Sequence, residues 1–204
     1  MLSDEFLALI RKSAVRHYKC EREPAAIELL SIYAKERHDD SYALFILGDC
    51  LRILGRLKEA KTFLLQAVKT APSRRKLYVE CRLGMLDNAC GRFTRAEKWY
   101  ARASKRTKGR SLSWLWILRG ANLAKSGRFD IALDCYRVAL ECSGRDDEAH
   151  LNIGLIHRAK GEYTLAAQAF RRALSCDSQY AEARSALESL EGLDEAFQLI
   201  QSAS

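Results

Sequence analysis

Proline and glycine are scarce in this chain. Only 2 of its 204 residues are proline and 11 are glycine, which is poor material for an all-β protein with many tight turns. Hydrophobic residues make up 48% of the sequence, too many for a disordered chain. The composition therefore predicts a packed and mainly helical protein.

Long apolar runs and paired cysteines are also missing. No stretch approaches the roughly 20 apolar residues that a membrane span needs, and Asp4 and Glu5 stand where a secretory signal carries positive charge. The 7 cysteines are scattered and contain no C-x-x-C pair, which is typical of a reducing compartment. We expect a protein that is soluble, not exported and cytoplasmic.

A pattern of small and large residues repeats through the middle of the chain. Each copy begins with a glycine, and these glycines, 36, 36 and 34 residues apart, are Gly48, Gly84, Gly120 and Gly154. A second glycine follows seven residues later, at Gly55, Gly91, Gly127 and Gly161. An alanine, a large residue and another alanine come next; the large residues are Leu64, Tyr100, Tyr136 and Phe170.

These positions have a physical interpretation. Each copy contains two apolar-periodic stretches, which indicate two amphipathic helices. The second glycine lies where the first helix must end and turn. The early glycine and the alanines are expected where two helix backbones approach closely, with the large residue filling the gap beside them.

The pattern resembles the tetratricopeptide repeat, a helix–turn–helix of about 34 residues. The matching residues of the first clear unit are Leu44, Leu47, Gly48, Leu51, Ala60, Leu64, Ala67 and Pro72. The units are placed at 41–74, 77–110, 113–146 and 147–180. Residues 1–40 are interpreted as a degenerate helical hairpin and residues 181–204 as a capping helix and tail, with one helix over 181–190 and a further short helix over 193–200. The resemblance implies an all-α, right-handed α-solenoid.

The resemblance also implies a concave groove lined by the first helix of each unit. The candidate groove residues are Tyr42, Phe45, Asp49, Arg52, Tyr78, Met85, Asn88, Trp114, Ile117, Leu151, Leu155 and Arg158. Cys81, Ala121, Ala124 and Glu148 are at the other inward positions. Aromatic side chains flanked by arginine are typical anchors for a partner peptide or helix. The alternatives are that these residues pack internally, or that Phe197 and Ile200 of the tail fill the groove.

Positive charge is concentrated in one segment. Residues 91–128 contain eleven Lys or Arg and one acid, a net charge of +10, whereas the whole chain carries +8. The candidate basic patch consists of Arg95, Lys98, Arg102, Lys105, Arg106, Lys108 and Arg110. The first four share one helix face, and Trp99 beside them could stack a base. Such a patch attracts acidic protein or nucleic acid; the alternative is a solvated helix face.

Catalytic motifs are missing as well. The chain has no G-x-x-x-x-G-K-[S/T], G-x-S-x-G or H-E-x-x-H. His150 and His157, seven residues apart, are interpreted as packing histidines in the core rather than metal ligands. Asp146 is expected to cap a helix. No enzymatic activity, metal or cofactor is expected.

These observations predict a protein–protein interaction module, an adaptor or chaperone-like holder of a partner peptide or helix. One alternative is an electrostatic binder of nucleic acid or another polyanion through the patch at 92–110. Another is a structural role in self-association.

Overall fold

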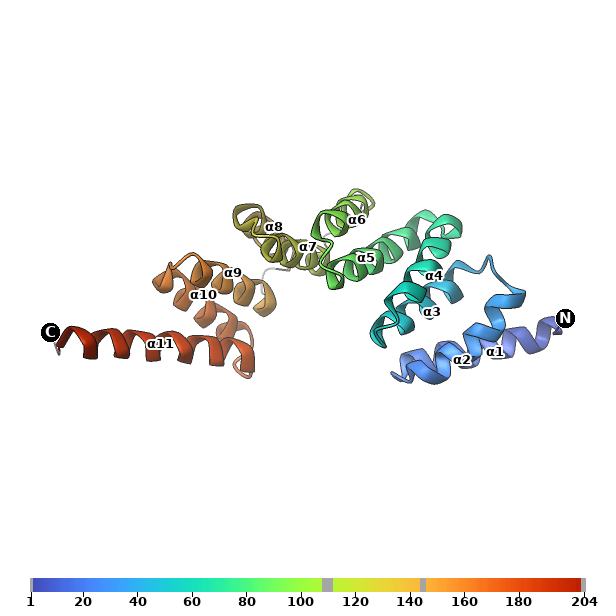
Figure 1. The fold of residues 1–204 in the computed structure, drawn as a ribbon, viewed down its shortest axis with the longest axis horizontal. Helices are drawn as coiled ribbons and strands as arrows, with labels where there is room; N and C mark the ends of the chain where they lie inside the picture. The colour runs from blue at the N-terminus through green and yellow to red at the C-terminus, as the bar shows by residue number, and fades with distance from the viewer. Residues whose placement is uncertain (1, 108–111, 144–145, 203–204) are drawn as a thin grey trace. The chain divides into compact units, whose positions relative to one another are not determined.

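The computed structural model describes residues 2–107, 112–143 and 146–202, and regular structure within these ranges is entirely helical (Figure 1). The helices are α1 (Asp4–Lys19), α2 (Glu23–Glu36), α3 (Ser41–Ile53), α4 (Leu57–Thr70), α5 (Ser73–Ala89), α6 (Phe93–Lys105), α7 (Ser113–Lys125), α8 (Phe129–Ser143), α9 (Asp147–Ala159), α10 (Tyr163–Cys176) and α11 (Ala181–Ser202).

Neighbouring helices pair into hairpins. α1 packs on α2, α3 on α4, α5 on α6, α7 on α8, and α9 on α10, while α11 packs on α10. The chain divides into two compact units, Met1–Lys108 with α1–α6 and Gly109–Ser204 with α7–α11. The predicted all-helical solenoid of helix–turn–helix pairs is confirmed.

The turn of each later hairpin depends on a glycine in the left-handed region. Gly91 has φ +69°. Its N–H donates to the Asn88 carbonyl at 2.9 Å, and the Arg92 N–H donates to the Asp87 carbonyl at 2.8 Å. These two bonds form the Schellman closure of a helix end. Gly55, Gly127 and Gly161 have φ between +75° and +77°, so the predicted helix-ending role of the second glycine is confirmed.

The early glycine of each repeat faces the large residue of the same hairpin. A Cβ added to Gly84 would lie 2.6 Å from the Tyr100 ring, and one added to Gly154 would lie 2.4 Å from the Phe170 ring. The expectation of a backbone-to-backbone approach was therefore incomplete. The nearest atoms belong to the large side chain, which lies across the glycine and takes the space of its missing side chain.

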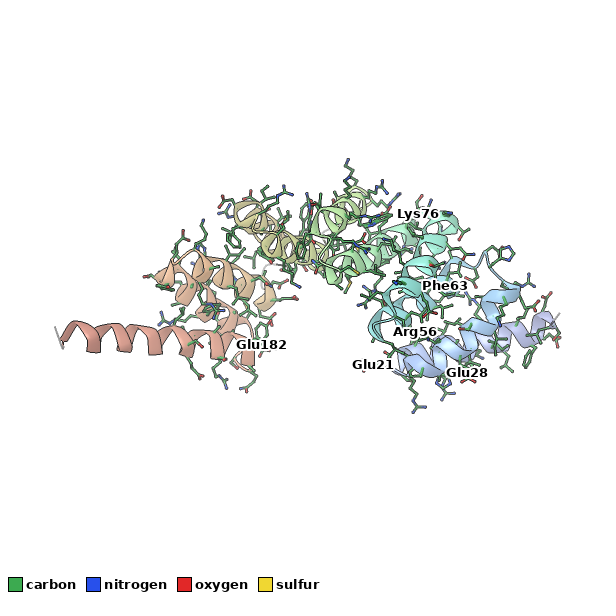
Figure 2. The ribbon with its side chains drawn as sticks, viewed as in Figure 1. Glu21, Glu28, Arg56, Phe63, Lys76 and Glu182 are labelled. Carbon is green, nitrogen blue, oxygen red and sulfur yellow. The ribbon has the colours of Figure 1, made fainter. Side chains whose placement is uncertain are left out.

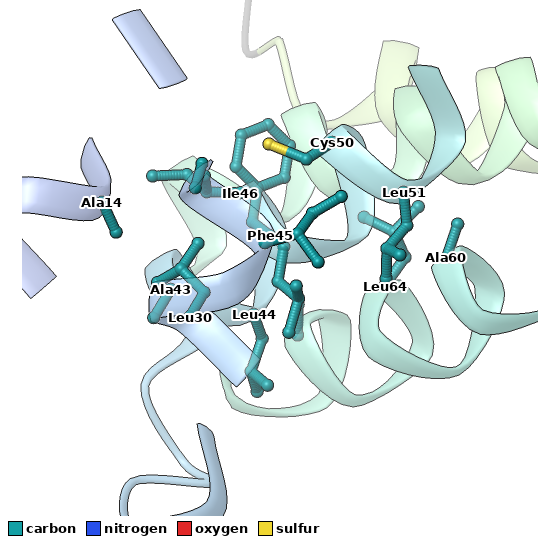
Figure 3. Close-up of a cluster of buried hydrophobic side chains, with 14 of the residues drawn as sticks. Ala14, Leu30, Ala43, Leu44, Phe45, Ile46, Cys50, Leu51, Ala60 and Leu64 are labelled. Carbon is teal, nitrogen blue, oxygen red and sulfur yellow. The ribbon is translucent and has the colours of Figure 1, made fainter. Parts of the chain in front are cut away.

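The core of the N-terminal unit joins α1, α2, α3, α4 and part of α5. Figure 3 shows Ala14, Leu30, Leu44 and Leu64 within this cluster, each no more than 1% exposed. The hairpin α1–α2 follows the same plan as the later ones, but its turn residue is Glu21 with φ 53° (Figure 2). A non-glycine residue in this region is strained, so the first hairpin keeps the turn at an energetic cost.

The C-terminal unit contains two buried clusters, one around Tyr136 and one around Phe170. The expected cap is confirmed, because the Asp146 carboxylate accepts the Ala149 N–H at 3.0 Å. The prediction of two separate helices after residue 180 is wrong: α11 continues through Gly192 to Ser202, because a single mid-helix glycine costs only about 1 kcal/mol of helix propensity. The alternative in which Phe197 and Ile200 fill a groove concerns side chains that lie outside the described part of the chain.

Candidate functional site

Three successive first helices of the N-terminal unit meet at one carboxylate. Asp49 of α3 is 1% exposed. It accepts hydrogen bonds from Tyr18 Oη of α1 at 2.9 Å, Arg52 Nε of α3 at 2.8 Å and Arg82 Nε of α5 at 2.8 Å. Buried charges require this kind of pairing. Asp49, a candidate groove residue, therefore holds helices together and is not itself accessible to a partner.

The Asp49 cluster carries excess positive charge. Two guanidinium groups share one carboxylate, and the side chains of Arg52 and Arg82 remain 19% and 28% exposed. Burial and the nearby Asp49 charge raise the pKa of Tyr18 to about 12, so its hydroxyl stays a neutral donor. The cluster can therefore offer one positive charge to an acidic group at the surface of α3 and α5.

The candidate groove aromatics of this unit differ in exposure. Phe45 is 9% exposed and belongs to the core. Tyr42 is partly buried beneath Arg11 and Arg75, whose guanidinium carbons lie 5.5 and 4.8 Å from the ring centre. Tyr78 is 46% exposed. These positions favour internal packing for Phe45 and partner contact for Tyr78.

A pocket of about 270 Å³ opens between α7 and α9 in the C-terminal unit. Its lining residues are Ala121, Ala124, Lys125, Phe129, Asn152, Leu155 and Ile156. Ala121, Ala124 and Leu155 are at inward positions that the family resemblance implied. The two small alanines of α7 leave the space that the pocket occupies, and Lys125 adds a positive charge to an otherwise mainly apolar wall.

The other candidate groove residues are distributed as follows. Ile117 and Leu151 are buried, Met85, Asn88 and Trp114 are partly buried, and Arg158 is exposed.

The outer face of α6 carries a stripe of exposed cations. This cationic stripe consists of Arg95, Lys98, Arg102 and Lys105. None of the four forms an ion pair with a described residue. Arg106 differs, because it donates to the buried Glu80 carboxylate from Nε at 2.7 Å and from Nη2 at 3.0 Å. Lys108 and Arg110 lie outside the described residues.

Trp99 has a structural role beside this stripe. Its indole Nε1 donates to Asp87 Oδ2 at 3.1 Å, and the Arg102 guanidinium lies 5.1 Å from its ring centre. Asp87 is 1% exposed and also pairs with Lys61 at 3.3 Å. Because Arg102 covers the indole and the ring edge is engaged, the arrangement does not favour the predicted base-stacking role.

The histidine pair departs from the expected core packing. His150 and His157 are only partly buried, and both line a pocket between α8, α9 and α10. His157 Nδ1 lies 2.5 Å from Glu162 Oε2. In the portion of the chain that the structure describes, no group of three or more His, Cys, Asp and Glu side chains could hold a metal ion. Burial raises the pKa of the Cys50 and Cys81 thiols to about 12, which makes them poor nucleophiles.

Sequence reasoning missed Tyr18 and Arg82 as partners of Asp49. The signal was their spacing, because Tyr18 precedes Asp49 by 31 residues and Arg82 follows it by 33. Each separation is close to one repeat, so polar residues one repeat apart lie on adjacent first helices. An acid between two such residues is therefore a recognisable sign of an inter-repeat contact.

Comparison with known proteins agrees with this geometry. Tetratricopeptide repeat models match residues 41–74 and 117–181. The chain is a tetratricopeptide repeat protein. Membership of this family implies a role in protein–protein interaction, and the family is typically non-catalytic. No curated protein matches the sequence.

Several solved tetratricopeptide structures share the fold. MamA 41-end from Desulfovibrio magneticus RS-1 is 16% identical with a TM-score of 0.75, covering 89% of this chain and 99% of its own. MamA MSR-1 is 20% identical with a TM-score of 0.71, covering 87% of this chain and 100% of its own. A chain of the APC/C hetero-tetramer Cut9-Hcn1 is 18% identical with a TM-score of 0.75, covering 89% of this chain and 35% of its own.

Among the described helices, none combines the length and apolarity needed to cross a bilayer. The cytoplasmic location stays a prediction.

Proposed function

We propose that this tetratricopeptide repeat protein is an adaptor or chaperone-like holder that binds a peptide or helical segment of another protein on its first-helix faces. The observation that carries the proposal is the pocket between α7 and α9, which has mainly apolar walls and Lys125 at one side. A pocket of this kind accepts an apolar anchor residue of a partner.

The N-terminal unit adds complementary features. Tyr78 exposes an aromatic ring on α5, and Arg52 and Arg82 present excess positive charge beside it on α3 and α5. An apolar segment with an acidic residue would satisfy both kinds of contact. Protein partners of tetratricopeptide repeats are therefore expected to be retained through apolar contacts, with charge contributing to selectivity.

The experiment is affinity capture from a nuclease-treated lysate with quantitative mass spectrometry. Ala121→Glu places a charged side chain in the α7/α9 pocket, and Ala25→Glu makes the same change at a partly buried alanine of α2, outside that pocket. A protein retained by wild type and Ala25→Glu, and lost from Ala121→Glu, supports the proposal. Tyr78→Ala combined with Trp114→Ala is expected to weaken the same complex by more than about 2 kcal/mol. Equal retention of that protein by wild type and all variants contradicts the proposal.

The cationic stripe of α6 favours a second function, the electrostatic binding of nucleic acid or another polyanion. Four exposed cations at helical spacing, without ion-pair partners among the described residues, create a local positive potential. Binding of labelled single-stranded RNA should fall steeply with salt and should be lost in a Lys98→Glu/Arg102→Glu variant. A charge reversal at Lys12, on the distant helix α1, is the control. Salt-insensitive binding, or binding that survives the double reversal, rejects this function.

The apolar face of α1 favours self-association as a third function. Phe6 and Leu9 of α1, three residues apart, are 48% and 62% exposed, and Leu2, which precedes the helix, is 38% exposed. Sedimentation velocity over a concentration series tests this, with Phe6→Ser/Leu9→Ser as the variant that should remain monomeric. A concentration-independent monomer in wild type rejects it.

A further inference from the structure

A second pocket lies in the C-terminal unit, on a different set of helix faces from the α7/α9 pocket. It is formed by α8, α9 and α10, and its lining residues are Leu133, Arg137, Leu140, His150, Ile153, His157, Leu165, Gln168, Ala169 and Arg172. On α8 and α9 these residues recur at spacings of three or four, and on α10 Leu165 and Arg172 lie three or four residues from the adjacent pair Gln168 and Ala169, which is the pattern of a single helix face. Three helices therefore present one face each to a common trough, here called the outer pocket.

The floor of the outer pocket is apolar. Leu133 and Ala169 are buried at 7% and 5% exposure, and Leu140 and Ile153 are partly buried around them. Leu165 stands at the edge with 46% of its surface exposed. A large exposed aliphatic side chain beside an apolar floor loses solvent contact if another apolar group enters.

The volume of the outer pocket limits what can enter. It is about 220 Å³, below the roughly 300 Å³ at which small-molecule and cofactor pockets begin. A space of this size matches one or two amino-acid side chains and is small for a drug-sized ligand or a dinucleotide. The size favours a segment of another protein over a cofactor.

The polar groups of the outer pocket are basic. Its lining contains two arginines, two histidines and a glutamine, and no aspartate or glutamate. Arg172 forms no ion pair with any described residue. Arg137 pairs with Asp134 at 2.6 Å, but both side chains are 66% exposed, and such surface pairs exchange partners at little cost.

His150 lies at the same end of the pocket as Arg172. Burial, and then the positive charge of Arg172, lower the pKa of His150, while Asp146 opposes them. His150 is therefore a neutral imidazole at pH 7 and can donate one hydrogen bond without adding charge. His157, at the other end of the same α9 face, is engaged by Glu162.

We propose that the outer pocket binds an acidic peptide segment of a partner protein in which a large aliphatic residue is adjacent to an Asp or Glu. The aliphatic side chain covers the floor and contacts Leu165, and the carboxylate lies against Arg172, with His150 and Arg137 beside it. Charge complementarity selects the acidic residue, because no lining residue is a carboxylate and Arg172 forms no ion pair with a described residue. This surface is separate from the first-helix faces of the proposed function and does not depend on them.

The test uses a randomised peptide library displayed on phage, selected on the full-length protein at low and moderate salt. The selected peptides are then synthesised, and their affinities are measured by fluorescence anisotropy. We expect enrichment of an aliphatic–acidic pair and an affinity that falls when the acid is replaced by its amide. Arg172→Gln and Leu165→Gln, both at exposed positions, should each weaken binding by roughly tenfold.

Arg171→Gln is the matched control, because Arg171 is the adjacent arginine and does not line the pocket. It should bind with wild-type affinity, and circular dichroism should show equal helicity in all variants. An Ala121→Glu variant should also bind normally, which separates this pocket from the α7/α9 pocket. The proposal is overturned if the selection yields no peptides, if the selected peptides lack acidic residues, or if Arg172→Gln binds as tightly as wild type.

Discussion

The packing of Phe170 across Gly154 allows a sharp prediction about stability. An added Cβ at Gly154 would lie 2.4 Å from Cε1, 2.6 Å from Cδ1 and 3.1 Å from Cζ of Phe170. Carbon atoms pack at roughly 3.5–4.0 Å, so the ring would have to retreat by about 1 Å. Phe170 is fully buried among the side chains of α10 and α11, and a ring so enclosed has little room to move.

Gly154→Ala should therefore destabilise the protein. Overpacking of a core costs about 1–3 kcal/mol, and the upper end applies because the obstructing atoms are an enclosed ring. Replacing a mid-helix glycine by alanine stabilises the helix by about 1 kcal/mol, which offsets part of this cost. The expected net loss is about 2 kcal/mol, measured by urea denaturation followed with far-UV circular dichroism.

The chain supplies a control of opposite sign. Gly192 is also helical, in α11, but a Cβ there would have no neighbour within 4 Å. Gly192→Ala should raise the free energy of unfolding by up to about 1 kcal/mol. A Phe170→Val background removes the three ring atoms that obstruct the added methyl group. In that background, Gly154→Ala should lower the free energy of unfolding much less than it does in wild type. If Gly154→Ala is as stable as wild type, or behaves as Gly192→Ala does, the reasoning about this repeat position is refuted.

Three further predictions concern single residues. Glu21→Gly should stabilise the protein by about 1 kcal/mol in urea denaturation, because it relieves a left-handed turn residue; a loss of stability would contradict the strain. Tyr136→Phe should stabilise by about 1 kcal/mol in the same assay, because the buried Tyr136 hydroxyl has no hydrogen-bond partner among the described residues; destabilisation would reveal a hidden partner. Burial opposes the ionisation of Asp40, but hydrogen bonds from Arg11 and the Ala43 N–H lower its pKa overall. Asp40→Asn should therefore lower the free energy of unfolding at neutral pH by up to about 1 kcal/mol after solvent screening. This difference should vanish as pH falls through the lowered pKa of Asp40; a pH-independent difference in denaturation midpoints would contradict the assignment.

The candidate site was only partly predictable from sequence. The resemblance to the tetratricopeptide family implied the inward positions of the first helices, and Ala121, Ala124 and Leu155 line a pocket between α7 and α9. Asp49, at the position equivalent to Ala121 and Leu155, is buried and paired instead. Equal sequence positions have unequal exposure because the neighbouring helices carry different side chains, and the repeat pattern does not encode those differences.

Charge counting had a similar limit. It located the cationic stripe of α6, but it also included Arg106, which is held by Glu80 of α5 at 2.7 Å. The acid lies 26 residues earlier in the chain, outside the segment over which the charge was counted. Pairing across a hairpin is therefore not visible in a local sum of charges.

The sequence by itself determined the helical hairpins of this protein. Turn glycines, alanine pairs and large residues recur at one spacing, and each acts within a single hairpin, so local pattern is enough to specify them. The tertiary structure alone decided which polar side chains are structural and which are available to a partner. Asp49 and Arg172 illustrate this, since the first is enclosed by donors from three helices and the second faces a pocket formed by three others. Availability depends on contacts between successive hairpins, whose partners lie about one repeat away along the chain.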